Sequence, residues 1–376
     1  NAAPSVTAAA TLTAAAASFR THGYAVLPGF ASADEVQAMR ASMRDMVAAW
    51  WTDERAATSR TDNVFTTGEN QTAAQAQSRY FFDSSDRVHF FREAVTDQAE
   101  LPVDAPPLNK VGHGLHLDTS TPFGAYSQSA RVAQVAREVA GLRAPVLPQS
   151  MYIFKSAEVG GPVTSHQDGT FLYTQPQQTV VGLWLALDEA HEENGCLWAR
   201  PGSHLEPLRR RFVRSVGADG EVAMTFVDAR ASVGESYLAP RLLGSSLAPP
   251  PLRWFRAVWT AVQRRLRLSA SRRHTARSEA ARTWEGTYPR PNATYGASTG
   301  AELEAHGFVP VPVKAGDLVL FPGTLDHLSL PNGSPHDRHT FQLHMVEGPE
   351  GGVTWAEENW LQYPGGNKGG AEFPRI

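Results

Sequence analysis

The stretch QSMYIFK, residues 149 to 155, marks the point where the chain changes its hydrophobic pattern. From here apolar residues alternate with polar ones or form continuous runs, which predicts β-strands at short spacing. The later runs are TVVGLWLALDEA (179–190), ENGCLWARPGSH (193–204), FVPVPVKAGDLVLFPG (308–323) and HTFQLHMVEG (339–348). Gly-Pro, Asn-Gly and Pro-Gly pairs mark turns between them. The sequence predicts a mainly β fold with flanking helices, either a β-sandwich or a jelly roll.

The first third of the chain is expected to supply the helices. Its alanine-rich opening, up to about residue 19, is expected to be mobile, and HGYAVLPGF (22–30) to hold a short strand. Ser32 and Glu35 form a capping box for a helix whose apolar residues Val36, Met39, Met43, Met46, Val47 and Trp50 recur at helical spacing. Residues 52 to 79 are polar and loop-like, RYFFDSSDRVHFF (79–91) is a dense aromatic patch, and a second helix is predicted near 129–141.

Residues 206 to 290 interrupt the strand pattern, with 16 arginines, no lysine and 7 acidic residues. We expect a single domain over 1–376, in which the jelly-roll core covers about 147–212 and 303–350 and an arginine-rich insertion covers about 213–302. The insertion is either a solvated excursion between two strands, or a lid or docking surface for an acidic partner.

Composition limits the classes of function. The chain has 376 residues, 42% of them apolar and 19% charged, which is typical of a globular protein. A net charge of −4 gives no reason to expect nucleic acid as a partner, and no apolar run is long enough for a membrane span. The single cysteine, Cys196, fits a reducing compartment, so we expect a cytoplasmic protein. Because the chain does not begin with methionine, peroxisomal targeting remains open.

Two His-x-Asp pairs, His116/Asp118 and His166/Asp168, are candidates for half of a metal site. Chance predicts about 0.55 such pairs in a chain of this composition, so the spacing alone chooses neither. His166 stands at the expected start of a strand, between two strong strand patterns, whereas His116 lies in a loop-rich stretch. Strand context therefore favours His166.

A third ligand and an anion anchor follow in DHLSLPNGSPHDR, residues 326 to 338. His327 follows one predicted strand, and Arg338 comes eleven residues later, just ahead of the next. Two histidines and one carboxylate on one face of a metal leave three positions open, as in non-haem Fe(II) oxygenases. The distal carboxylate of 2-oxoglutarate needs an anchor, and a bidentate guanidinium provides one.

Several motifs together resemble the phytanoyl-CoA dioxygenase family of Fe(II)/2-oxoglutarate oxygenases. They are MYIFK, GGPVTSHQDGTFLYT, GLWLALDEA, ENGCLWARPGSH and FPGTLDHLSLPN followed by an arginine. YFFDSSDRVHFF, LNKVGHGLH and TWAEENWLQYP resemble its phytanoyl-CoA dioxygenase domain-containing subgroup. The resemblance covers about 19–212 and 303–362, and the arginine-rich segment has no counterpart in it.

The resemblance implies a double-stranded β-helix (jelly roll, cupin-like), with His166, Asp168 and His327 as iron ligands and Arg338 as the cosubstrate anchor. It adds Lys110, Met151, Trp184 and Ser329 as further 2-oxoglutarate contacts. It places no ligand in GHGLHLD, so His116 and Asp118 become structural or pocket-wall candidates, and His113 and His116 stay open as substrate-facing residues. His204 in the PGSH turn is expected to be structural.

The implied activity is an Fe(II)- and 2-oxoglutarate-dependent dioxygenase that uses O₂, with ascorbate as a candidate stimulant, and hydroxylates a small-molecule or lipid-like substrate with release of succinate and CO₂. Retention of Asp168 favours hydroxylation over halogenation, because a halide needs the coordination position that the carboxylate fills. Two alternatives are a catalytically idle jelly roll that acts as sensor or scaffold, and a zinc hydrolase on a cupin-like barrel.

Overall fold

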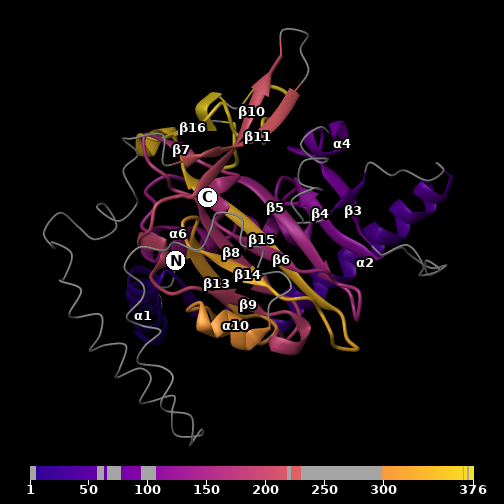
Figure 1. Cartoon of the computed structure of the whole chain (residues 1–376), viewed down its shortest axis with the longest axis horizontal. Coiled ribbons are helices and arrows are strands. Elements are labelled where there is room, and N and C mark those ends of the chain that lie inside the picture. The colour runs from indigo at the N-terminus through magenta and orange to yellow at the C-terminus, as the bar shows by residue number, and fades with distance from the viewer. Residues whose placement is uncertain are drawn as a thin grey trace, which may run out of the picture. The chain divides into compact units, whose positions relative to one another are not determined.

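The computed structural model describes residues 6–56, 63–65, 78–94, 107–217, 222–229, 299–366, 368–370 and 372–376 (Figure 1). The chain divides into two compact units, residues 1–238 with 294–376, and residues 239–293. Every described residue belongs to the first unit. Residues 230–298 of the expected insertion lie outside the described residues, so the single-domain organisation stays a prediction.

The larger sheet of the described part has eight strands, and all neighbours are antiparallel except β2 and β3. In order across the sheet the strands are β1 (Ala25–Leu27), β13 (Leu318–Pro322), β8 (Val181–Ala186), β15 (Arg338–Glu347), β5 (Pro145–Lys155), β4 (Leu108–His113), β3 (Val88–Glu93) and β2 (Val64–Phe65). Side chains that stand opposite each other in register share a face. Val319, Trp184, Gln342 and Met151 form one such row, on what we call the inner face.

A four-stranded antiparallel sheet faces this inner face. Its order is β12 (Val309–Val311), β9 (Leu197–Ala199), β14 (His327–Ser329) and β6 (Val163–His166). Contacts join the two sheets: the rings of Phe321 and His327 have centroids 4.6 Å apart, and Arg338 Nη2 donates to the Gly195 carbonyl at 2.8 Å. Two facing antiparallel sheets confirm the predicted jelly roll.

The outer face of the larger sheet is covered by helices. They are α1 (Val6–His22), α2 (Ala33–Ala56), α5 (Pro122–Ser127) and α6 (Ala130–Glu138). Phe123 of α5 contacts Phe341 of β15 at 5.1 Å between ring centroids, and Met39 and Met43 of α2 are 1% exposed. The capping box is present, because Ser32 N donates to Glu35 Oε2 and Glu35 N to Ser32 Oγ. The core positions predicted from helical spacing therefore pack as expected at this end of α2.

Three local expectations were wrong. The alanine-rich N-terminus forms helix α1 from Val6, because alanine has the highest helix propensity and Phe19, fully buried, anchors the helix. The polar segment expected from residue 52 begins later, since α2 continues to Ala56. His166 ends strand β6 instead of starting a strand, and Asp168 opens the 3₁₀ turn η1 (Asp168–Thr170). The first third also contributes strands β1 to β4 to the larger sheet.

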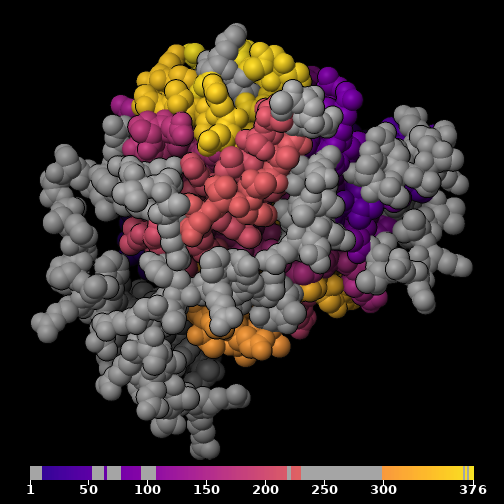
Figure 2. Space-filling view, turned by 45° about the horizontal axis from the view of Figure 1, so that its top comes forward, coloured from indigo at the N-terminus to yellow at the C-terminus, as the bar shows by residue number. Residues whose placement is uncertain are grey.

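A hairpin of β10 (Arg210–Val216) and β11 (Val222–Asp228) follows the core strands. Figure 2 shows it beside the C-terminal segment, and Arg214 N donates to the Glu358 carbonyl at 2.7 Å. Phe212 and Met224 from the hairpin share an apolar cluster with Trp355 and Trp360. The remaining α-helices and β-strands of the described residues are α4 (Arg79–Phe82), α10 (Gly300–Ala305), β7 (Thr174–Gln175) and β16 (Thr354–Trp355). Within the described residues, none of the helices has the length and apolar character needed to cross a membrane.

Candidate metal centre and cosubstrate pocket

His166, Asp168 and His327 converge between the two sheets. Asp168 Oδ1 lies 3.4 Å from His166 Nε2 and 3.6 Å from His327 Nε2. One potential ligand atom from each of the three residues lies within 4.8 Å of the other two. Among the described residues, these three form the group of His, Cys, Asp or Glu side chains that could hold a metal ion. Metal–ligand bonds of roughly 2.1 Å put adjacent ligand atoms roughly 3 Å apart, so a small rearrangement suffices for one ion to bind all three.

Strand pairing creates this convergence. β14 pairs with β6 so that His327 is the direct partner of His166. His166 Nδ1 lies 2.8 Å from the Thr164 carbonyl, and His327 Nδ1 lies 3.1 Å from the Leu325 carbonyl. A carbonyl only accepts, so both Nδ1 atoms carry a proton, and both Nε2 atoms face the centre. The rings are oriented for metal binding before an ion arrives.

The protonation states also suit a metal. Burial lowers the pKa of His327 to about 4, so its imidazole is neutral at pH 7. Burial alone would raise the pKa of Asp168, but the imidazoles of His344, His327 and His166 hold it well below the usual range. A neutral imidazole and an ionised carboxylate are the forms that bind divalent cations.

The rival pair does not assemble a site. His116 is fully buried, with Nε2 3.0 Å from the Leu147 carbonyl and Nδ1 3.0 Å from Ser150 Oγ. Asp118 lies at the surface and accepts from Ser120 N and Ser120 Oγ. His116 therefore fastens the turn after β4 to strand β5, whereas Asp118 orders a turn at the surface, so the two side chains do not meet in one site.

Arg338 lies at the start of β15 on the inner face and is 1% exposed. Its Nη2 donates to the Gly195 carbonyl, whereas Nε and Nη1 are buried without a hydrogen-bond partner. Within the described residues no carboxylate pairs with it, and burial lowers its pKa to about 10. A buried cation with two unpaired donors is costly, which indicates a site for a carboxylate that arrives with a ligand.

The other expected cosubstrate contacts divide into two groups. Trp184 and Met151 lie in one row of the inner face, and the guanidinium carbon of Arg338 stands 5.3 Å from the Trp184 ring centroid. Ser329 lies two residues beyond His327 on the same strand and is 6% exposed. These three residues lie on the strands that carry the triad and Arg338, or directly beside them.

Lys110 stands apart from that group. Its Nζ lies 3.2 Å from His113 Nε2 and 3.6 Å from the centroid of the Phe65 ring, with Phe81 and Phe91 also close. Lys110 shares the inner face with Ile153 of the neighbouring strand. Burial lowers its pKa to about 7, and within the described residues no carboxylate pairs with it. His113, which holds this amine, is 1% exposed.

Comparison with known proteins decides the family. The model of the phytanoyl-CoA dioxygenase (PhyH) family matches residues 19–221 and 271–340. The chain belongs to the phytanoyl-CoA dioxygenase family. The phytanoyl-CoA dioxygenase domain-containing protein 1 of Danio rerio is 32% identical over 347 residues, 92% of each chain. Phytanoyl-CoA dioxygenase 1 of Oryza sativa subsp. japonica is 32% identical and covers 92% of this chain and 91% of its own.

Solved structures overlap this PhyH-family chain more loosely. The epimerase SnoN, in complex with Fe³⁺, α-ketoglutarate and nogalamycin RO, gives a TM-score of 0.49 at 16% identity, covering 95% of this chain and 91% of its own. AviO1 from Streptomyces viridochromogenes Tue57 gives a TM-score of 0.46 at 19% identity, covering 89% and 94%. The sequence comparisons confirm the resemblance to the family and to its domain-containing subgroup. The family model also matches residues 213–221 and 271–302, so the expectation that the arginine-rich segment has no counterpart in the family was wrong for those residues.

Two residues of this PhyH-family site were missed by sequence reasoning. His344 Nε2 lies 3.1 Å from Asp168 Oδ2, and Gln149 Nε2 lies 2.9 Å from His344 Nδ1. The sequence could have indicated His344, because it follows Arg338 by an even number of residues in one predicted strand and therefore lies on the same face of the sheet. Gln149 offered no such signal, since its relation to His344 depends on the pairing of β5 with β15.

A buried ionic network supports the strand that carries His327. Asp326 is fully buried and accepts hydrogen bonds from Ser165 Oγ at 2.6 Å, Arg200 Nε at 3.2 Å and both terminal nitrogens of Arg209 at 2.9 Å. The PGSH turn joins it, as Asp326 N donates to Ser203 Oγ. His204 contacts the Arg20 carbonyl of α1 and keeps the structural role expected of it.

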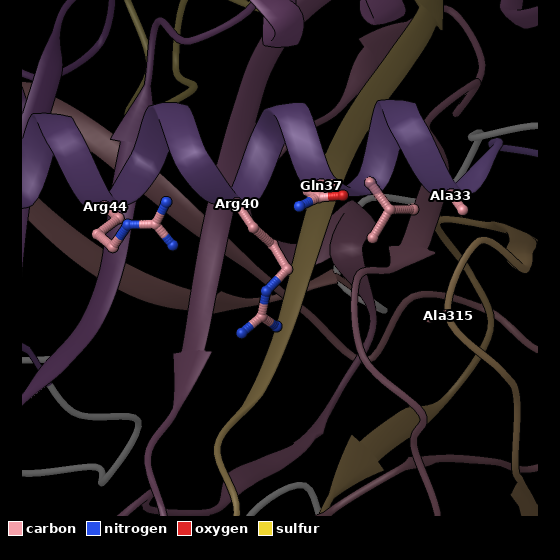
Figure 3. Close-up of a pocket in the computed structure, with 6 residues that line it drawn as sticks. Ala33, Gln37, Arg40, Arg44 and Ala315 are labelled. Atoms are coloured by element: carbon pink, nitrogen blue, oxygen red, sulfur yellow. The ribbon is translucent and has the colours of Figure 1, made fainter.

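A groove of about 340 Å³ lies along α2, away from the triad (Figure 3). It is lined by Ala33, Val36, Gln37, Arg40, Arg44 and Ala315. Arg40 forms an ion pair with Asp188, whose Oδ2 also accepts from His339 N at 2.9 Å. None of the residues predicted for the metal or cosubstrate lines this groove.

Proposed function

We propose that this chain is an Fe(II)- and 2-oxoglutarate-dependent dioxygenase that hydroxylates a small-molecule substrate. The observation that carries the proposal is the combination of two features: the Nε2 atoms of two histidines beside Asp168 Oδ1, and a buried guanidinium with two unpaired donors on the opposite sheet. A His-His-Asp set suits Fe(II) and leaves three coordination positions open. A guanidinium suits the distal carboxylate of a 2-oxo diacid.

In this proposal His166, Asp168 and His327 hold iron, and Arg338 binds 2-oxoglutarate by its far carboxylate. Bound iron supplies the oxygen-activating chemistry, in which O₂ and 2-oxoglutarate are consumed, one substrate C–H bond becomes C–OH, and succinate and CO₂ leave. Trp184 packs beside the guanidinium and keeps water from its carboxylate partner. Met151 and Ser329 would contact the bound cosubstrate. Lys110 would contribute a second positive charge from its place beside His113 and Phe65.

The substrate is proposed to approach on the side of His166. The side chain of His166 is 20% exposed, compared with 8% for Asp168 and 7% for His327. Phe171 lies on this side, with its ring centroid 6.1 Å from that of His166, and contacts Phe212 and Phe226 of the hairpin. An aromatic wall supports an organic, small-molecule or lipid-like substrate over a hydrated one. Cys196 is buried and unpaired, which fits the cytoplasm as the proposed location.

The test is succinate formation by purified protein given Fe(II), ascorbate, 2-oxoglutarate and air. Asp168→Ala removes a proposed ligand, and Asp118→Ala removes the surface aspartate of the other His-x-Asp pair. We expect wild type and Asp118→Ala to form succinate and Asp168→Ala to form none above the rate of free iron. Equal turnover by all three proteins would overturn the proposal, and so would loss of turnover in both variants alike.

A further inference from the structure

The two oxygens of Asp168 have different surroundings. Oδ1 faces the Nε2 atoms of His166 and His327. Oδ2 lies on the other side, 3.1 Å from His344 Nε2. An ionised carboxylate only accepts hydrogen bonds, so His344 Nε2 carries a hydrogen and donates it. One oxygen is thus available to a metal while the other is already engaged by the protein.

A row across the larger sheet builds the partner of Oδ2. Gly182, His344 and Gln149 are direct neighbours in register on β8, β15 and β5. Gln149 Nε2 lies 2.9 Å from His344 Nδ1, and both residues are buried, at 5% exposure each. The donor role of His344 Nε2 does not depend on which way the Gln149 amide faces, because Oδ2 can only accept. Gln149 therefore fixes the ring plane from behind.

Gly182 makes room for this arrangement. A Cβ at position 182 would lie 2.9 Å from Asp168 Oδ2 and 2.7 Å from Cε2 of Phe321. Any larger residue would push the carboxylate away from His344 or displace the Phe321 ring, which itself contacts His327. The sheet is thus shaped around the position of Oδ2.

We propose that His344, oriented by Gln149, is a positioning residue that keeps Asp168 monodentate through Oδ1. The inference rests on the proposed function. A monodentate carboxylate with two imidazoles leaves three positions, enough for the two donor oxygens of a 2-oxo acid and for O₂. A carboxylate free to turn and bind through both oxygens would take one of them. His344 therefore protects the position that cosubstrate or O₂ needs.

The experiment uses full-length protein loaded with Co(II), whose visible absorption reports coordination number, and calorimetry of 2-oxoglutarate binding without oxygen. His344→Leu removes the donor, and His344→Gln returns an amide N–H near the place of Nε2. Gln149→Leu removes the residue behind the ring, and His306→Gln changes an exposed histidine as the control. Circular dichroism checks that each variant is folded.

We expect His344→Leu to bind Co(II) with a changed spectrum and to lose about tenfold or more in 2-oxoglutarate affinity. His344→Gln is expected to recover most of that affinity, Gln149→Leu to lie between, and His306→Gln to match wild type. An unchanged spectrum and unchanged 2-oxoglutarate affinity in folded His344→Leu would overturn the role of His344. If His344→Leu does not fold, His344→Gln and Gln149→Leu test the role of His344 instead. A folded His344→Gln whose 2-oxoglutarate affinity is not close to that of wild type overturns the donor role.

Failure of the proposed function would look different. Wild-type protein would then bind no 2-oxoglutarate in the presence of metal, so the variants would have no wild-type affinity to be compared with. Binding by wild type that is equal in the folded variants contradicts the inference about His344 alone.

Discussion

His327 stands directly opposite His166 in the pairing of β14 with β6, and their ring centroids are 4.2 Å apart. The two residues are far apart in the sequence, yet the pairing fixes their distance and backbone carbonyls fix their tautomers. Such a site binds an ion with little reorganisation, so most of the binding free energy is available to stabilise the fold.

Metal should therefore raise thermal stability through this triad. A ligand at a hundred times its Kd stabilises the native state by about 2.7 kcal/mol. We expect Mn(II), a redox-inert substitute for Fe(II), to raise the melting temperature of wild type and of Asp118→Ala, and EDTA to reverse the shift. Asp168→Ala should show no shift. A metal-dependent rise that survives in Asp168→Ala would contradict the assignment of the ligands.

Arg338→Met should separate stability from binding. The guanidinium is buried with Nε and Nη1 unpaired, so replacing it with an apolar side chain of similar length removes a desolvation cost. In urea unfolding without ligands, we expect the variant to be at least as stable as wild type. Its 2-oxoglutarate affinity should fall by a factor of about 30 or more, because losing one partner of a buried charge pair costs about 2–5 kcal/mol. Strong destabilisation with retained affinity would show that Arg338 is a structural residue.

Arg338→Lys serves as its matched companion. Lysine keeps the charge but offers a point donor in place of the planar pair of N–H groups. Affinity for 2-oxoglutarate should fall between those of wild type and Arg338→Met. Affinity for a monocarboxylic 2-oxo acid should be similar in all three proteins, because such a ligand has no distal carboxylate to lose.

Lys110 predicts a pH dependence of cosubstrate binding. Burial lowers its pKa to about 7, so the amine is charged below that pH and becomes neutral as the pH rises through it. Because 2-oxoglutarate is a dianion throughout, its affinity should decline from pH 6 to pH 9. The bound anion favours the charged amine and moves the midpoint upward.

Two variants isolate that effect in calorimetry of the Mn(II)-loaded protein. Lys110→Met should bind 2-oxoglutarate weakly, and its affinity should not fall between pH 6 and pH 9 through loss of the lysine charge. Lys110→Arg stays charged over this pH range, so it should retain its affinity for 2-oxoglutarate throughout. A wild-type pH profile in folded Lys110→Met would assign the dependence to another group. The nearest titratable neighbour, His113, is held neutral by burial and by the Lys110 charge, which lower its pKa well below the usual value.

Asp326→Asn should destabilise the fold severely. Asp326 is fully buried and pairs with Arg200 and Arg209, whose side chains are 7% and 14% exposed. Removing its charge takes the carboxylate away from the buried Arg209 guanidinium and leaves Arg200 paired with Glu206. A broken buried ion pair costs about 3–5 kcal/mol. Urea unfolding measures the change, and Asp118→Asn at the surface is the control, for which we expect a much smaller effect. Similar losses in both variants would contradict the role of the network.

The jelly roll could be predicted from the sequence because its strands alternate or run apolar, and the capping box at Ser32 could be predicted because its contacts span only three residues. Their order along the chain and the family pattern pointed to His166, Asp168 and His327 as candidate ligands and to Arg338 as the candidate anchor, and the structure brings the first three together. The N-terminal helix was missed because a weakly apolar alanine segment gives no periodic signal, although its propensity and the burial of Phe19 suffice to form it.

The sequence by itself determined the fold class, the family and the order of the chemical groups, because these depend on local periodicity and on the spacing of motifs. Only the tertiary structure showed which His-x-Asp pair has a second histidine beside it, and that Arg338 is buried with unpaired hydrogen-bond donors. It also showed that the Lys110 amine lies among aromatic rings and that His344 contacts the second oxygen of Asp168. These relations depend on register between strands that lie up to about 200 residues apart, as His344 and Gln149 do, and on burial, which changes the pKa and the hydrogen-bonding needs of a side chain without any mark in its local sequence.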